Sequence, residues 1–335
     1  MMNASMDRDA RAVLLPAFDR LDVMDVMAPF LEKGGCSVLI GESRAEYVAR
    51  AMSAERLDQE TPEGFRAAIA VLRAASPRLI VAVDQELGGI QRLQGLVPPL
   101  PALDEAHALA GDVLAERCRT TAAAARDLGV SMFLAPIADI IDDRNPWLEA
   151  RTMGTCPQAV ARLVAAFVEG VQAAGITAVT KHFPGFNSLS ADPALADVSL
   201  LTSRARLLQD ALPFRAAIEA GTKAIMTGPA PVAAIDADNA ASTSPAVMAM
   251  LRQDFGFTGL IVSDDLDAPA TLRGRSLAET AVASLNAGAD LLLVGGGPHL
   301  DALCEDIAAA ARDGRIAPGR LAEAAARVRR NAAGE

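Results

Sequence analysis

Residues 175–185 read GITAVTKHFPG, and this stretch indicates the fold. A glycine that would end a helix is followed by an apolar run rich in β-branched residues, as expected where a helix leads into a buried strand. The run ends in Lys181 and His182, and Pro184-Gly185 then opens a loop. The stretch therefore predicts a buried strand that presents two polar side chains at its carboxyl end.

The same pattern occurs eight times along the chain. Each apolar run is followed by a polar loop and an alanine-rich, helix-forming segment, which is typical of β-α units. The expected strands lie near residues 12–16, 36–41, 78–84, 130–136, 176–182, 223–228, 259–264 and 290–295. Their two alternating faces are both apolar, which favours a parallel sheet covered on both sides.

Eight such units over roughly 300 residues predict an α/β fold of one domain, a (β/α)8 TIM-type barrel. An open doubly wound sheet is the competing architecture. No stretch resembles a flexible linker, so we expect the barrel to occupy residues 9–335 and residues 1–8 to be a disordered tail.

The composition limits the kind of ligand. With a net charge of −11, the chain lacks the clustered positive surface that nucleic acid or an anionic membrane requires. A small neutral or cationic ligand is easier to reconcile with this charge. No apolar run approaches the roughly 18 residues of a membrane span, and charged residues occupy the start of the chain. We therefore expect a soluble, cytoplasmic protein, and the sequence leaves its oligomeric state open.

Cysteine and histidine are too sparse and too scattered to suggest a metal site. The four cysteines show no CxxC spacing, and the three histidines never occur at metal-ligand spacing. We expect free thiols, no metal and no cofactor.

Polar residues gather where the predicted strands end. In a barrel of this type the carboxyl ends of the strands carry the chemistry, because the loops that follow them meet at one face. The candidates are Asp84-Gln85-Glu86, Asp139, Lys181-His182, Thr227-Gly228-Pro229 and Ser263-Asp264-Asp265. A single polar strand end is ordinary, but five at one barrel mouth predict a site.

Four segments in order resemble the signatures of glycoside hydrolase family 3. The segments are Asp84 to Leu93 (DQELGGIQRL), Ala135 to Asp139 (APIAD), Lys181 to Gly185 (KHFPG) and Ser263 to Leu266 (SDDL). The resemblance extends from about residue 30 to residue 325 and is closest to the single-domain β-N-acetylhexosaminidase-like branch. It implies the family's N-terminal (β/α)8 domain, a small carbohydrate or glycoside ligand, and hydrolysis of O-glycosyl bonds.

The resemblance also implies roles for individual residues. It places the catalytic nucleophile on Asp264 and sugar-binding residues on Asp84, Arg92, Arg151, Lys181 and His182. These residue types suit the task, because a carboxylate accepts hydrogen bonds from hydroxyl groups and Arg and Lys donate them. Asp265 is expected in a supporting or capping role.

The sequence departs from the family at the residue that should transfer a proton. Family members of this branch carry Asp-Ser-His in the loop after the KHFPG motif, and the histidine is the general acid and base. Here the loop carries Asp192-Pro193-Ala194, so the aspartate stays and alanine replaces the histidine. Two further family histidines are replaced by Phe186 and Gly228, and a family arginine by Gly89.

Several functions stay open on these residues. The first is a retaining glycosidase in which Asp192 or Glu149 donates the proton. The second is an enzyme that uses activated leaving groups or transfers a glycosyl group. The third is a catalytically silent sugar-binding relative. A different class would be a barrel aldolase, with Lys181 forming a Schiff base and Gly295-Gly296-Gly297 cradling a phosphate.

Overall fold

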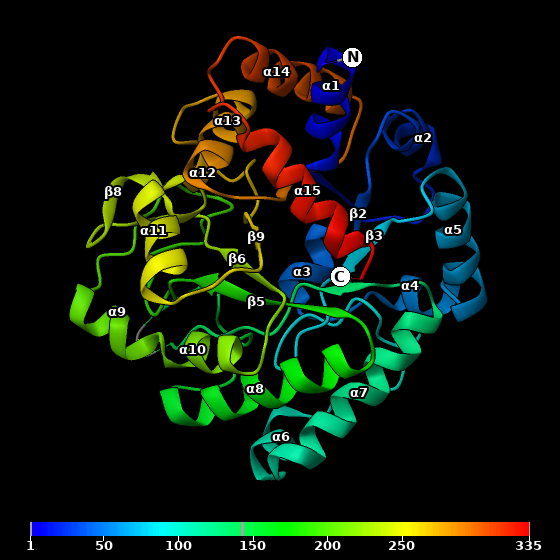
Figure 1. Ribbon diagram of the computed structural model, residues 1–335. Helices are drawn as coiled ribbons and strands as arrows, with labels where there is room; N and C mark the ends of the chain where they lie inside the picture. The colour runs from blue at the N-terminus through cyan, green and yellow to red at the C-terminus, as the bar shows by residue number, and fades with distance from the viewer. Residues whose placement is uncertain (1, 142–143, 335) are drawn as a thin grey trace.

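The computed structural model describes residues 2–141 and 144–334, with parallel strands at the centre and helices around them (Figure 1). The barrel strands are β1 (Leu14–Phe18), β2 (Ser37–Ile40), β3 (Ile80–Val83), β4 (Met132–Phe133), β5 (Thr177–Phe183), β6 (Ala224–Thr227), β9 (Leu260–Val262) and β10 (Leu292–Gly295). Each overlaps one of the eight predicted strands. Nearly all their residues are buried, as two covered faces require.

The strands close into a barrel. Neighbours pair in the order β10-β1-β2-β3-β4-β5-β6-β9, and all these pairings are parallel. The last gap, between β9 and β10, is closed by a parallel bridge between Val262 and Leu291, and the Ser263 N–H donates to the Leu291 carbonyl at 2.9 Å. The (β/α)8 prediction is therefore confirmed, and the open doubly wound alternative is excluded.

The helices form the outer ring in Figure 1. They are α1 (Met2–Ala12), α2 (Met24–Glu32), α3 (Arg44–Ala49), α4 (Ala54–Gln59), α5 (Pro62–Ala75), α6 (Leu103–Ala108), α7 (Gly111–Asp127), α8 (Pro157–Ala173), α9 (Arg204–Asp210), α10 (Leu212–Glu219), η1 (Ala241–Thr243), α11 (Pro245–Ala249), η2 (Met250–Asp254), α12 (Pro269–Leu272), α13 (Leu277–Ala287), α14 (Leu300–Arg312) and α15 (Arg320–Ala332). Among the described residues no helix is long and apolar enough to cross a membrane. All four cysteines are free thiols.

The structure corrects the prediction of a disordered tail over residues 1–8. Its described part, from Met2 onward, lies in helix α1, which sits beside α14 and α15 (Figure 1). Asp7 pairs with Arg312 at 3.0 Å, and Arg11 pairs with Asp301 at 3.0 Å. These long-range ion pairs join residues some 300 positions apart and could not be read from local sequence. A second addition is the short hairpin of β7 (Pro231–Val232) and β8 (Asp236–Ala240), which no pattern predicted.

The closing seam of the barrel is fixed at its amino end by one buried carboxylate. Asp290, directly before β10, has no exposed surface. Its Oδ2 accepts hydrogen bonds from Arg252 and from the Ile261 N–H, each at 3.0 Å. Its Oδ1 accepts from Arg320 at 2.8 Å and Arg327 at 3.0 Å. The carboxylate thus joins β9 and β10 to η2 and α15.

We predict that Asp290→Asn lowers the free energy of unfolding by about 3 kcal/mol, because three partly buried arginines lose their buried counter-charge. Urea denaturation followed by circular dichroism measures the change. Asp313→Asn is the control, because the Asp313–Arg315 pair is exposed and its two charges are 3.7 Å apart. Such a pair contributes at most about 1 kcal/mol. Equal losses in the two variants would contradict the role given to Asp290.

Candidate active site

A cavity of about 630 Å³ opens at the carboxyl ends of the barrel strands. This volume is in the usual range for a small-molecule site. Five of the predicted site residues line it: Asp84, Arg151, Lys181, His182 and Asp264. The structure therefore brings together, at the expected face of the barrel, side chains that are up to 180 positions apart in the sequence.

A buried ionic network forms one wall of the cavity. Lys181, on β5, donates to Asp84 at 2.6 Å and lies 2.8 Å from Glu86, the fully buried carboxylate two residues beyond Asp84. Arg151 donates to both oxygens of Glu86, at 2.6 and 3.3 Å, and to the Tyr47 hydroxyl at 2.9 Å. Each cation thus shares Glu86 and is held before any ligand binds.

The charges in this network reinforce one another. Burial opposes ionisation of Glu86, but Arg151 and Lys181 hold the pKa of that carboxyl far below its usual range. Burial likewise disfavours the Lys181 cation, but Asp84 and Glu86 raise the pKa of its ammonium above the usual value. Glu86, Arg151 and Lys181 are therefore charged at neutral pH, and Lys181 is a hydrogen-bond donor rather than a free amine.

His182 is oriented by Asp139. Its Nδ1 lies 2.8 Å from Asp139 Oδ2, which also accepts the His182 backbone N–H at 2.9 Å. Burial lowers the pKa of His182 well below its usual value, so the imidazole is neutral, while burial raises the pKa of Asp139 to about 7. When Asp139 is ionised, it accepts the ring proton of His182 Nδ1. Nε2 is then free to accept a hydrogen bond from a ligand in the cavity, beside the Trp147 ring, whose centroid is 4.4 Å from that of His182.

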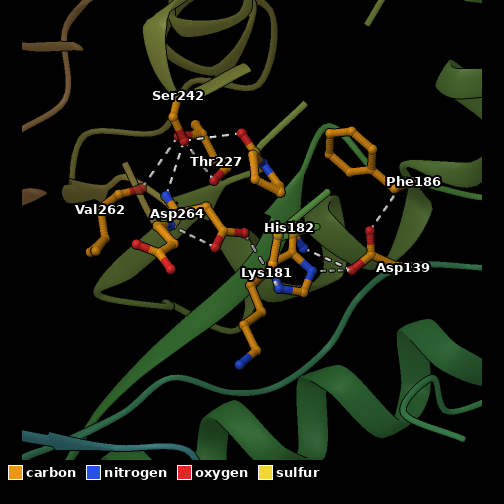
Figure 2. A network of polar contacts seen from close by, with 12 residues as sticks. Asp139, Lys181, His182, Phe186, Thr227, Ser242, Val262 and Asp264 are labelled. Carbon is orange, nitrogen blue, oxygen red and sulfur yellow. Dashed lines mark hydrogen bonds and ion pairs between the residues drawn. The ribbon is translucent and has the colours of Figure 1, made fainter. Parts of the chain in front are cut away.

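Asp264 points into the same space (Figure 2). Its Oδ1 accepts the Asp265 N–H at 2.8 Å, and its Oδ2 lies 3.8 Å from His182 Nε2. Oδ2 is buried and has no hydrogen-bond partner among the described residues. Burial raises the pKa of Asp264 to about 6, although the Asp265 N–H and the charge of Lys181 act in the opposite direction. One oxygen is thus anchored, and the other is free to react.

The position of Asp264 is fixed through its backbone. Its N–H donates to the Thr227 carbonyl at 3.1 Å and to Ser242 Oγ at 3.0 Å (Figure 2). Ser242 Oγ in turn lies 3.0 Å from both the Thr227 and the Gly228 carbonyl, which share its single hydroxyl proton. The Asp265 N–H binds the Asp264 carboxylate, and the Asp265 side chain accepts the Asp267 N–H at 3.3 Å.

Arg92 is a correction. We expected it to bind substrate, but it has no exposed surface and does not line the cavity. Its guanidinium donates to both oxygens of Glu60 at 2.8 Å and to the Gly41 carbonyl at 2.7 Å. All of its donor groups therefore serve the loop after β2, which makes Arg92 a structural residue.

Asp192 and Glu149, the two candidate proton donors, are not brought to the cavity wall either. Asp192 Oδ2 binds Arg44 at 3.0 Å and its Oδ1 accepts the Ala194 N–H at 2.9 Å. Glu149 is exposed. Pro193 and Ala194 do line the cavity, so the methyl group of Ala194 faces the space where the family resemblance places a histidine.

The other departures from the family fit together in space. The Phe186 ring lies against Gly228, and a Cβ atom at position 228 would overlap it. The same ring makes an edge contact with Trp147, with centroids 5.7 Å apart. A Cβ atom at position 89 would overlap the Glu86 carboxylate. Phe186 with Gly228, and Glu86 with Gly89, are therefore complementary pairs.

Sequence reasoning missed the groups that support the binding residues. It noted Glu86 and Asp139 only as polar strand ends, and it gave no role to Tyr47, Trp147 or Glu42, which line the cavity. A signal existed for Glu42, because it follows the predicted second strand by one residue, where a barrel carries its site residues. Tyr47 lies in the short helix α3 and Trp147 in a turn, and no sequence pattern predicts that either side chain faces the cavity.

The aldolase alternative does not fit this site. A Schiff base requires an unprotonated lysine, whereas Asp84 and Glu86 stabilise the Lys181 cation. The triglycine segment offers no phosphate cradle, because the Gly295 N–H donates to Asp267 at 2.6 Å and the Gly296 N–H to the Ala17 carbonyl at 2.8 Å. Among the described residues, no group of three or more His, Cys, Asp or Glu side chains is placed to hold a metal.

Comparison with known proteins agrees with the family resemblance of the sequence motifs. The model of the glycosyl hydrolase family 3 N-terminal domain matches residues 41–331. The chain belongs to glycosyl hydrolase family 3. The β-hexosaminidase of Tolumonas auensis is 35% identical over 231 residues, which are 67% of this chain and 68% of that enzyme.

Two further relatives are longer than the region that they share with this chain. The β-hexosaminidase of Nitrosomonas eutropha is 33% identical over 65% of this chain, and the match spans 65% of that protein. A family 3 β-N-acetylglucosaminidase from a Paenibacillus species superposes with a TM-score of 0.85 at 27% identity, over 98% of this chain and 62% of that one. The chain thus spans about two thirds of the length of these relatives.

We predict that Asp264→Asn stabilises the protein at neutral pH. Because burial raises the pKa of Asp264 from 3.8 to about 6, the folded state resists the ionisation that occurs in the unfolded chain, and stability is lost as pH rises through about 6. A neutral amide avoids this loss, so the free energy of unfolding should rise by about 3 kcal/mol at pH 7 and be unchanged near pH 4. Urea denaturation at the two pH values measures it. Glu149→Gln, an exposed control, should be neutral at both, and a gain for Asp264→Asn that did not depend on pH would contradict the explanation.

Proposed function

We propose that this family 3 protein is a retaining glycoside hydrolase in which Asp264 is the nucleophile and the usual loop histidine is absent. The observation that carries the proposal is the Asp264 carboxylate at the cavity wall, with one oxygen anchored by a backbone N–H and the other buried, unpaired and 3.8 Å from His182 Nε2. A buried polar atom without a partner is unfavourable, and such atoms concentrate at functional sites. The relatives named as β-hexosaminidases support a hexosamine-type glycoside as the substrate class.

The surrounding groups suit the binding of a sugar ring. Asp84 and His182 Nε2 accept hydrogen bonds from hydroxyl groups, and Lys181 and Arg151 donate them. The network through Glu86 fixes the two cations in advance, so little conformational entropy is lost when a sugar binds. Trp147 and Tyr47 add aromatic surface to the wall.

The proposed reaction has two displacement steps. Asp264 Oδ2 attacks the anomeric carbon, and the bond to the leaving group breaks with its electron pair remaining on the leaving oxygen. Water then attacks the anomeric carbon of the glycosyl ester and breaks its bond to Asp264 Oδ2, which releases the sugar and restores the carboxylate. The proton that water loses passes to solvent and balances the anionic leaving group released in the first step. Ionisation of Asp264 is required, so the first step should slow as pH falls below about 6.

Ala194 determines which substrates this chemistry can serve. Without a proton donor, the leaving oxygen must carry negative charge, which favours glycosides with acidic leaving groups. Without a base, attack by water in the second step is also slow. We therefore expect the covalent intermediate to persist, and transfer to acceptors better than water to compete with hydrolysis.

A catalytically silent sugar-binding protein is the second candidate, and Ala194 is the observation that favours it. The clamps Asp84, Arg151, Lys181 and His182 would also serve binding alone. An unpaired carboxyl group with a raised pKa, however, weakens folding, and Asp264 stands at the position where the family resemblance places the nucleophile. Formation of a covalent intermediate separates the two candidates.

Trapping tests the nucleophile directly. Incubation with 2-fluoro and 5-fluoro glycosides of several sugars, each with an activated leaving group, should give one covalent adduct by intact mass, mapped to Asp264 by peptide sequencing. Asp264→Ala should give none, and Asp265→Ala should keep it. No adduct from any donor, combined with sugar-induced thermal stabilisation, would leave the silent binding protein as the function.

Restoring the histidine tests the missing proton donor. Ala194→His should raise kcat/KM by about 10²-fold on aryl glycosides with poor leaving groups, and much less on activated ones, because general acid catalysis contributes about 10²–10⁴-fold. Ala194→Gln, of similar size but without a titrating group, is the control. An equal gain in both variants, or gains unrelated to leaving-group pKa, would argue that another group already transfers the proton.

A further inference from the structure

Glu42 is a cavity residue to which the proposed reaction gives no role. It follows β2 by two residues and lines the same cavity as Asp84, Lys181 and Asp264. It is half-buried, and its Oε2 is buried without any hydrogen-bond partner among the described residues. A buried carboxyl oxygen without a partner is unfavourable, and we infer that a ligand supplies the partner that the folded chain lacks.

The two nearby cations, Lys181 and Arg151, already bind other groups of the chain. Lys181 is bound by Asp84 and Glu86, and Arg151 by Glu86 and the Tyr47 hydroxyl. Three carboxyl groups, those of Glu42, Asp84 and Glu86, therefore share two cations, and Glu42 is the one left without a partner. Burial raises the pKa of Glu42 to about 8, and the charges of Asp84 and Glu86 add to the effect.

The departure from the family at position 89 points the same way. Gly89 stands where the family carries an arginine, and the Glu86 carboxylate occupies the space that its side chain would enter. The site has thus lost one cation while it holds an unpaired carboxyl group. A ligand that brings its own positive charge would restore the balance.

We propose that Glu42, together with Asp84, determines the specificity of the sugar subsite by selecting a glycone that carries a protonated primary amine. An ammonium group has three donors, and charge-assisted hydrogen bonds to carboxylates are about twice as strong as neutral ones. A hydroxyl group leaves the excess negative charge uncompensated, and an N-acetyl group carries no positive charge. The inference rests on the proposed function, because it takes this cavity as the site of the sugar.

Binding of an ammonium group would ionise Glu42. The carboxyl proton leaves to buffer as the ammonium arrives, so the protein should release up to about one proton per ligand at pH 7. A neutral sugar should release none. Proton release therefore reports on Glu42 itself, independently of affinity.

Isothermal titration calorimetry of the whole chain at pH 7 tests the proposal. The ligands are the 2-amino, 4-amino and 6-amino deoxy derivatives of glucose, with glucose and N-acetylglucosamine for comparison, in two buffers of different ionisation enthalpy. At least one amino sugar should bind about tenfold more tightly than glucose and release protons. Glu42→Gln should abolish both effects, so that the variant binds the amino sugar no more tightly than glucose, and the exposed Glu149→Gln should change nothing.

Three outcomes would overturn the proposal: no amino sugar binding better than glucose, a preference for the amine that survives Glu42→Gln, or tight binding without proton release. The comparison among sugars on the wild-type chain holds even if Glu42→Gln folds poorly. Covalent trapping at Asp264 without a preference for amines would remove only this inference. A preference for amines without trapping would remove only the hydrolase.

Discussion

The carboxylate of Glu86 binds two cations at once, and the geometry of the sugar-facing wall depends on this shared contact. It joins the end of β3 to Lys181 on β5 and to Arg151 in the loop before α8. Losing one partner of such a buried network generally costs about 3–5 kcal/mol, so the arrangement is strongly maintained. Because the cations are fixed by protein rather than by ligand, the site is organised before a sugar enters it.

The same network explains why the remaining carboxyl groups of the cavity are unusual. Lys181 and Arg151 both bind Glu86, so the carboxyl groups around it are stabilised less by positive charge. Burial therefore acts on Glu42, Asp264 and Asp265 with weak opposition and raises the pKa of each, to about 8, 6 and 7 respectively. A region with several carboxyl groups poised between charged and neutral forms is typical of a functional site.

Much of the fold and of the candidate site could be predicted from the sequence, because the strands of a barrel pair in the order in which they occur along the chain. Repeated buried strands fix the order of the barrel, and the ends of those strands fix the site face, so Lys181 and Asp264 could be placed together without coordinates. Side-chain direction could not be predicted. Arg92 lies in a matching motif, yet its guanidinium points away from the cavity to Glu60, and Asp192 turns to Arg44.

Partners that are distant in sequence were also beyond prediction. Helix α1 is held by ion pairs to α14, which no local composition could reveal, and the matched motifs assign nothing to Glu42 because its neighbours lie on other strands. Sequence reasoning thus identifies the residues that a motif contains. It does not identify those that become important only through their surroundings.

The departures from the family form a pattern that bears on whether the site has changed or decayed. Phe186 fills the space above Gly228, Glu86 occupies the space above Gly89, and the loop that bears Ala194 is tied down by the Arg44–Asp192 pair at 3.0 Å. Unconstrained loss of function would leave cavities or unpaired groups at the substituted positions, since nothing would select replacements that fit. Instead, in the part of the chain that the structure describes, the buried side-chain atoms without a hydrogen-bond partner are Asp264 Oδ2 and Glu42 Oε2, at the cavity, and Arg11 Nε, which lies in α1. The chain is thus packed at positions 186, 228 and 89, while the unpaired oxygens of Asp264 and Glu42 belong to residues that line the cavity. This arrangement favours a site of altered specificity over a decayed one.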